Sequence, residues 1–172
     1  RLPDPTIAKQ ELYKRLVLSV KEATSPGEYA LFYTYYSEFS KVLGDQLPAL
    51  IPQVYLHYDP RTMKERGCAP VLLRQRMDML LLIERNVRIV IEVDGKQHYA
   101  DGDKASTTKY ADMVAEDRRL RLAGYELYRF GASEFKDVTL SDGRYTIGSV
   151  AKKVVINFFQ QLFEKHHIKT KL

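Results

Sequence analysis

The sequence predicts an α/β fold, a sandwich in which a central mixed four-stranded sheet lies between helices, and three observations support it. Apolar residues recur at helical spacing near both ends of the chain and again in residues 107–123. Residues 71–84 and 87–94 are apolar at nearly every position, which is typical of strands buried on both faces. Helical and extended segments also interleave along the chain, an order that favours helices packed around one sheet.

Two helices are expected before residue 44. Residues 6–23 carry apolar side chains at helical spacing, with Lys and Glu between them. Residues 25–28, Ser-Pro-Gly-Glu, have the composition of a helix start, with the serine as N-cap and the proline in the first turn. We expect this second helix to run to about Leu43 and to stop at Gly44.

Three strands are expected in the middle of the chain. Residues 53–58 alternate well enough for a strand, and residues 61–69 have the composition of a charged loop. The long apolar strands 71–84 and 87–94 follow, with a turn at 85–86 between them. These two strands should therefore form a hairpin at the centre of the sheet.

The second half of the chain returns to helices around one more strand. Residues 100–106 form a polar loop, and residues 107–123 form a helix. Residues 125–130 alternate as a strand, with Tyr, Leu and Arg on one face and Glu, Tyr and Phe on the other. A Ser-Asp-Gly-Arg turn at 141–144 precedes the last helix, expected at about 146–166.

Size and composition indicate one ordinary globular domain. The chain has 172 residues, of which 45% are apolar and 28% charged. It begins with Arg1 instead of Met, so we expect it to be a domain of a longer protein. The single cysteine, Cys68, fits a reducing, cytoplasmic setting, and no apolar run approaches the length of a membrane span. The net charge of +5 is compatible with a polyanion such as nucleic acid.

Three carboxylates interrupt the two long apolar strands. Asp78 lies in the first strand, and Glu92 and Asp94 lie in the second. Burying unpaired carboxylates is costly, and a bound cation or a basic partner offsets that cost. Because side chains alternate along a strand, Glu92, Asp94 and Lys96 share a face if the strand stays regular. The sequence therefore predicts two acids and an amine on one face, beside Asp78 on the next strand.

This set is suited to hydrolysis of phosphodiester bonds. Three converging carboxylates form a hard oxygen site for Mg²⁺ or Mn²⁺, and the metal can polarise a phosphate. Lys96 can orient a water nucleophile or help to deprotonate it, and His98 can contact a phosphate or the leaving group. Two alternatives stay open, because His98 can be structural and the acids can be paired with arginines. The candidate arginine partners are Arg74, Arg76, Arg88 and Arg129.

The hairpin must meet one geometric condition for this site to exist. Directly opposed residues of an antiparallel pair share a face. A strict two-residue turn at 85–86 would pair Glu84 with Val87, and would therefore place Asp78 opposite Val93. Asp78 would then face away from Glu92. The site requires a different loop length or a β-bulge.

The motif resembles a known family of nucleases. Asp78 followed by Asp94-Gly95-Lys96 resembles the bipartite signature of the PD-(D/E)XK superfamily. Residues 91–98 are similar to the E-x-D-G-x-x-H strand of endonuclease-like domains related to very-short-patch repair enzymes. Three further segments resemble the same domains: Ser25-x-x-Glu28 their S-x-x-E helix start, Pro52-Gln53 a glutamine-bearing strand, and residues 117–130 their D-x-x-L-x-x-x-G-Y-x-v-x-R-F block.

The resemblance implies a restriction-endonuclease-like, three-layer α/β/α fold that cuts DNA with Mg²⁺. It implies a nuclease core at 25–135, preceded by a helical extension at 1–24 and followed by a C-terminal helix at 146–168. It also implies that Glu28 reaches the metal, although an acid in the first turn of a helix also stabilises the helix dipole. Either Glu92 or Asp94 can be the principal ligand, and the spacing to Lys96 favours Asp94.

The expected function is a Mg²⁺-dependent endonuclease, an effector module of a bacterial defence or repair system. Basic residues of the helix 107–123 and its surroundings would contact the DNA backbone, or else form a solvated surface. The alternatives are an inactive nuclease-like module for nucleic-acid binding or assembly, and an RNase or exonuclease. A homodimer is left open. The expected nucleic-acid contacts are Lys104, Lys109, Arg118, Arg119 and Arg129.

Overall fold

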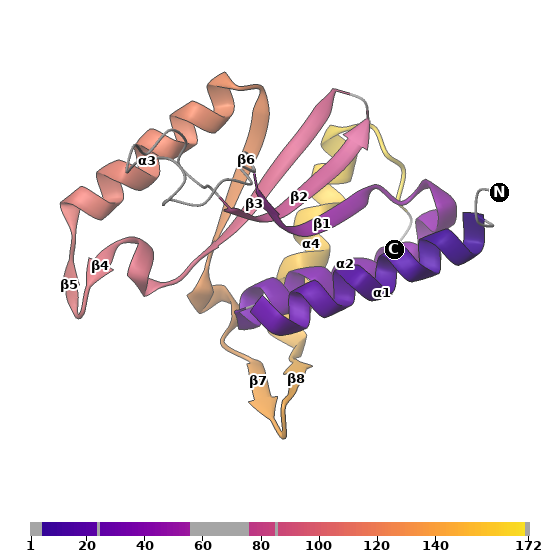
Figure 1. Cartoon of the computed structure of the whole chain (residues 1–172), viewed down its shortest axis with the longest axis horizontal. Helices are drawn as coiled ribbons and strands as arrows, with labels where there is room; N and C mark the ends of the chain where they lie inside the picture. The colour runs from indigo at the N-terminus through magenta and orange to yellow at the C-terminus, as the bar shows by residue number, and fades with distance from the viewer. Residues whose placement is uncertain (1–4, 24, 56–75, 85, 171–172) are drawn as a thin grey trace, which may run out of the picture.

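The computed structural model describes residues 5–23, 25–55, 76–84 and 86–170. The expected loop at 61–69, Cys68, Arg74 and the first residues of the strand 71–84 lie outside these ranges. The described residues form four long helices and a central four-stranded sheet with small hairpins (Figure 1). The α/β class and the four-stranded mixed sheet expected from the sequence are therefore confirmed. None of the described helices is long and apolar enough to cross a membrane.

The central sheet has the strand order β1-β2-β3-β6. Its strands are β1 (Ala49–Tyr55), β2 (Arg76–Glu84), β3 (Val87–Asp94) and β6 (Tyr125–Gly131). The first three are antiparallel to one another, and β6 is parallel to β3. A parallel pair needs a crossover, which is supplied by the helix α3 (Thr107–Leu122).

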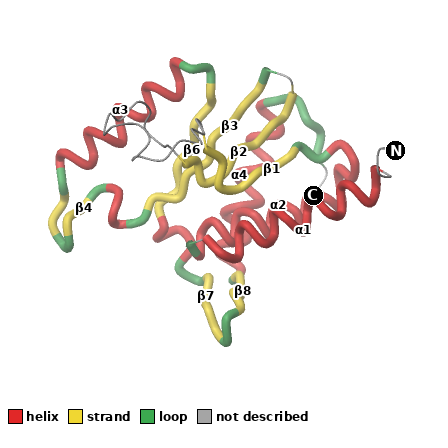
Figure 2. Tube along the Cα trace, in the orientation of Figure 1, coloured by secondary structure: helices red, strands yellow, loops and turns green. Residues whose placement is uncertain are grey.

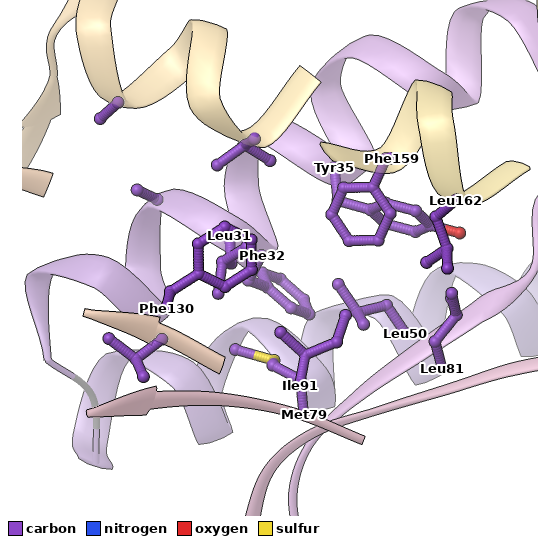
Figure 3. Close-up of a cluster of buried hydrophobic side chains, with 14 of the residues drawn as sticks. Leu31, Phe32, Tyr35, Leu50, Met79, Leu81, Ile91, Phe130, Phe159 and Leu162 are labelled. Atoms are coloured by element: carbon purple, nitrogen blue, oxygen red, sulfur yellow. The ribbon is translucent and has the colours of Figure 1, made fainter. Parts of the chain in front are cut away.

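Helices pack against both faces of this sheet (Figures 1 and 2). One face meets α1 (Pro5–Ala23), α2 (Pro26–Leu43) and α4 (Ser149–Lys165) in the first core, which is rich in aromatic side chains (Figure 3). The other face meets α3 in the second core, a smaller cluster built around Val90 and Leu120. The alternation expected in β6 is confirmed, because Leu127 belongs to the second core and Phe130 to the first.

The start of α2 follows the expected capping pattern. The Ser25 hydroxyl accepts from the Glu28 N–H, and a Glu28 carboxylate oxygen accepts from the Ser25 N–H at 3.2 Å. This reciprocal pair is a capping box, which satisfies two backbone donors that a helix start leaves unpaired. The helix ends at Leu43 before Gly44, as the sequence predicts.

Two boundaries differ from the expectation. The first strand begins at Ala49, earlier than the predicted residue 53, because Pro52 is accommodated in β1, at an edge of the described sheet. The last helix begins at Ser149 and not at residue 146, because residues 144–147 form β8 (Arg144–Ile147) and pair with β7 (Val138–Ser141). The expected turn at 141–144 is the tip of this hairpin.

The polar segment after β3 is more ordered than a loop. Lys96–His98 form a short 3₁₀ helix, η2. A two-stranded hairpin follows, made of β4 (Ala100–Asp101) and β5 (Lys104–Ala105), and leads into α3. This arrangement ends the extended backbone at Asp94, and α3 then packs against η2 and β6.

Candidate active site

The hairpin of β2 and β3 contains the β-bulge that the candidate site requires. Glu84 lies opposite Val87, as in a strict two-residue turn, but the register then shifts at Ile83. Ile83 is the extra residue of the bulge. Beyond it the ladder runs without another shift, and its continuation by one pair places Asp78 opposite Glu92. The geometric condition is met, and the two carboxylates share a face.

The line through Asp78 and Glu92 continues into the neighbouring strands β1 and β6. In β6, Arg129 lies beside Glu92 in the parallel register. In β1, the pairs on either side of Gln53 place it opposite Asp78. Four polar residues therefore cross a largely apolar sheet in one line, with one contributed by each strand. We call Gln53, Asp78, Glu92 and Arg129 the polar row.

Asp78 and Glu92 form the buried negative centre of the row. The Asp78 carboxylate accepts from the Val93 N–H at 2.9 Å, so a backbone donor of β3 is used by a side chain of β2. Glu92 is only 8% exposed. Burial, and then the negative charge of Asp78, raises the pKa of Glu92 to about 9. Burial also raises the pKa of Asp78, against the effect of the Val93 N–H.

Asp94, the last residue of β3, is held by Arg129 of β6. Arg129 Nη1 donates to Asp94 Oδ1 at 2.8 Å, while its Nε and Nη2 donate to Asp117 Oδ1 at 2.9 and 2.7 Å. All three side chains are largely buried, at 12–22% exposure. Arg129 thus connects β6, β3 and α3, and it places a positive charge next to Glu92. One of the expected structural pairings, an acid of β3 with Arg129, is therefore present.

Glu28 approaches the row from the start of α2. Its side chain is buried at 6% exposure, and one oxygen accepts from Gln53 Nε2. Burial, followed by the negative charge of Asp78, raises the pKa of Glu28. Both roles considered for Glu28 are therefore compatible with its position, because it completes the capping box and also lies within electrostatic reach of Asp78.

Lys96 does not lie with the acids. The strand ends at Asp94, and Lys96 belongs to η2, where its amine pairs with Asp103 and the side chain is 54% exposed. The expectation that Lys96 shares a face with Glu92 and Asp94 required a regular strand to residue 96, and this condition is not met because β3 ends at Asp94. His98 does return toward the site, because its Nδ1 lies 3.7 Å from Asp94 Oδ1.

A pocket of about 330 Å³ opens beside the row, between the end of β3 and α3. Glu92, Arg129 and His98 line it together with residues of α3. Its walls carry both signs of charge. The remaining lining residues are Arg76, Gln97, Lys109, Asp112, Met113 and Glu116.

The expected nucleic-acid contacts occupy four different environments. Lys109 lines the pocket but already contacts Asp101 at 2.6 Å and the Ala100 carbonyl at 2.7 Å. Arg119 pairs with Glu116 at 2.8 Å. Lys104 and Arg118 are exposed on β5 and α3. Arg129 is different from all of these, because it lies inside the acidic centre and not on a surface.

Two residues of the site were not singled out from the sequence as site residues. Asp117 holds Arg129, and Gln53 holds Glu28. Both lie in segments that resemble the nuclease motifs, and that position was the available signal. Their partners are 12 and 25 residues away in the chain, so spacing alone could not identify the contacts.

The donor chemistry of the site fits a hard divalent cation, although the described side chains are not gathered around one point. Among these residues, no group of three or more His, Cys, Asp or Glu is arranged to hold a metal ion. The Val93 N–H and Arg129 instead engage the oxygens of Asp78 and Asp94. Near Glu28, however, the buried Gln53 Oε1 has no hydrogen-bond partner. An oxygen of this kind beside carboxylates matches the ligands that Mg²⁺ prefers.

Known proteins do not place the chain in a family. No protein-family model, curated protein or solved structure matches it. The functional argument therefore depends on the chemistry and geometry of the polar row.

Proposed function

We propose that the chain is a Mg²⁺-dependent nuclease that hydrolyses phosphodiester bonds in DNA, with a three-layer, restriction-endonuclease-like fold. The observation that carries the proposal is the placement of Asp78 opposite Glu92 in the sheet, with Asp94 two residues further along β3. A β-bulge is needed to bring these carboxylates to one face. Such bulges commonly re-aim side chains next to active sites.

The carboxylates of Asp78 and Asp94, with Glu92 and Glu28 beside them, would hold the cation. When bound, Mg²⁺ polarises the phosphate and makes water a stronger acid. Arg129 orients Asp94 through its contact at 2.8 Å, while Asp117 fixes the guanidinium. Glu92 carries a proton near neutral pH because its pKa is raised, and it would have to lose that proton to act as a ligand to the cation.

His98 and Lys96 complete the proposed chemistry in different ways. The His98 imidazole, beside Asp94 in the pocket, would give a proton to the leaving oxygen. Lys96 would contact the phosphate only after leaving Asp103. That ion pair joins two exposed side chains, and such pairs contribute little free energy.

Binding of the DNA backbone is assigned to the basic residues around α3. Lys104 and Arg118 are exposed, and Lys109 and Arg119 lie in ion pairs that a phosphate can exchange. Contacts of this kind position a duplex without reading its sequence. They fit the effector module of a bacterial defence or repair protein, whose other domains would choose the target.

A second candidate function is a nuclease-like module that binds nucleic acid without cutting it. Two observations favour it: Lys96 lies away from the acids, and Arg129 already neutralises Asp94. Such a module would bind DNA and show no hydrolysis with any metal.

Cleavage assays separate the two functions. We expect wild type to cut plasmid DNA with Mg²⁺ or Mn²⁺, and Asp78→Asn to reduce the rate by at least about 100-fold, because a ligand to the cation is weakened. Asp142→Asn, at the exposed tip of the β7–β8 hairpin, is the matched control and should keep the wild-type rate. Equal rates in all three proteins would defeat the assignment. Wild type that binds but never cuts DNA or RNA would support the second function, and cleavage of RNA alone would identify an RNase.

A further inference from the structure

Gln53 has an unusual backbone conformation for a residue inside a strand. Its φ of 56° is in the left-handed region, which L side chains rarely adopt. The other described non-glycine residues with positive φ are Asp142, at a hairpin tip, and His167, after α4. Those positions are turns, where such conformations are common, whereas strain inside a strand often marks a functional position.

The left-handed conformation redirects the Gln53 side chain. Leu50 faces the first core, and regular alternation would point Gln53 to the opposite face. The helix α2 lies on the side of the first core, yet Gln53 Nε2 donates to Glu28 Oε2 of that helix. The strand changes sides at this point, since Val54 packs against the second core. The unfavourable backbone therefore serves a contact with Glu28.

The other end of the same amide is left without a partner. Gln53 Oε1 is buried and accepts no hydrogen bond. Exchanging the two amide atoms would still leave one of them buried without a partner, and Nε2 is the atom that can donate to a Glu28 carboxylate oxygen. Buried acceptors are nearly always satisfied, so an unpaired one needs an explanation. A cation beside Glu28 and Asp78 would satisfy it.

We propose that Gln53 is a further member of the metal site, in which Nε2 fixes Glu28 and Oε1 donates to the cation held beside Asp78. This inference rests on the proposed function. It explains three observations at one residue: the left-handed backbone, the contact with Glu28 and the unpaired buried oxygen. It also places an oxygen ligand on β1, so the site draws on α2 and three adjacent strands.

Direct binding of Mn²⁺ without DNA tests the inference. Mn²⁺ affinity is measured by calorimetry or by the electron paramagnetic resonance of the free ion. Gln53→Met keeps the length of the side chain and removes both polar atoms. We expect the folded variant to bind Mn²⁺ at least about tenfold more weakly than wild type. Gln161→Met, the same change on the exposed face of α4, should leave the affinity unchanged.

The outcomes separate this inference from the proposed function. If Asp78→Asn loses Mn²⁺ binding while Gln53→Met keeps it, Gln53 is not a ligand and the nuclease proposal stands. A lower melting temperature of metal-free Gln53→Met with unchanged affinity would show a purely structural role and overturn the inference. Wild type that binds no Mn²⁺ would remove both proposals.

A second variant covers the case in which Gln53→Met does not fold. Gln53→Glu keeps an oxygen at this position and adds a negative charge next to Glu28. We expect Mn²⁺ to raise its melting temperature by more than it raises that of wild type, because the cation relieves an added repulsion. An equal rise in the two proteins would contradict a cation at this position.

Discussion

Burial and the negative charge of Asp78 shift the pKa of Glu92 in the same direction. Both raise its pKa, to about 9, while in an unfolded chain the carboxyl has its ordinary value near 4.5. The folded protein therefore binds this proton more tightly than the unfolded chain does. The contribution to stability is complete below about pH 4.5 and is lost as the pH rises toward about 9.

Glu92→Gln is expected to remove this pH dependence. At about pH 8 the variant should be more stable than wild type by on the order of 1–3 kcal/mol, because an amide has no charge to desolvate. The difference should shrink toward about pH 5. Urea unfolding across this range measures it, with Glu164→Gln on the exposed face of α4 as control. A difference that is constant with pH would contradict the shifted titration.

The contacts of Arg129 lead to a second prediction, on the free energy of unfolding. Its guanidinium is the partner of two largely buried carboxylates, Asp94 and Asp117. Arg129→Met should lower the free energy of unfolding by about 3 kcal/mol, because both acids lose their counter-charge. Mg²⁺ should restore part of this loss by replacing the positive charge. Urea unfolding with and without Mg²⁺ measures both effects.

The control for this prediction is Arg144→Met, at an exposed position of β8. It should change the stability little in either condition. If Mg²⁺ stabilises Arg129→Met no more than wild type, no cation site lies near Asp94.

Among the elements, the β2–β3 hairpin decides whether the site exists. Both strands are apolar on both faces, so the hydrophobic pattern fixes the register only weakly. The bulge at Ile83 is what brings Asp78 opposite Glu92. The register is therefore set jointly by the turn and by the packing of the surrounding helices.

Deletion of Ile83 is expected to preserve the site. Ile83 is the extra residue, so its removal makes the hairpin regular and leaves Asp78 opposite Glu92. The variant should lose about 1–2 kcal/mol, because Ile83 packs partly against the first core. Thermal unfolding and Mn²⁺ binding are the measurements. A folded deletion variant that no longer binds the Mn²⁺ bound by wild type would show that the bulge has another role.

At the scale of the whole molecule, the polar row lies where the two cores meet. The first core joins α1, α2 and α4 to one face of the sheet, and the second core joins α3 to the other (Figure 1). The polar row crosses the sheet between these clusters. Met77 belongs to the second core and Met79 to the first, so β2 changes sides at Asp78. Burial of the acids follows from this placement.

Much of the architecture could be predicted from local patterns. The N-cap at Ser25, the apolar strands on either side of residues 85–86 and the helix from Thr107 depend on residues close together in the chain. The β7–β8 hairpin was missed because its strands, Val138–Ser141 and Arg144–Ile147, have only four residues each, and so short an alternation does not by itself predict a strand. The first strand begins at Ala49, before the predicted residue 53, because a proline can lie within a strand at the edge of a sheet.

The sequence by itself determined the fold class and the acids at the centre of the sheet, because hydrophobic periodicity and charge within a strand are local properties. Tertiary structure decided which side chains meet. The bulge sets the register that places Asp78 opposite Glu92. Because β3 ends at Asp94, Lys96 pairs with Asp103 and not with the acids of the strand. The crossover through α3 places Asp117 in contact with Arg129. These outcomes depend on register, on where a strand stops and on contacts between distant segments. No residue spacing in a single sequence encodes such contacts directly.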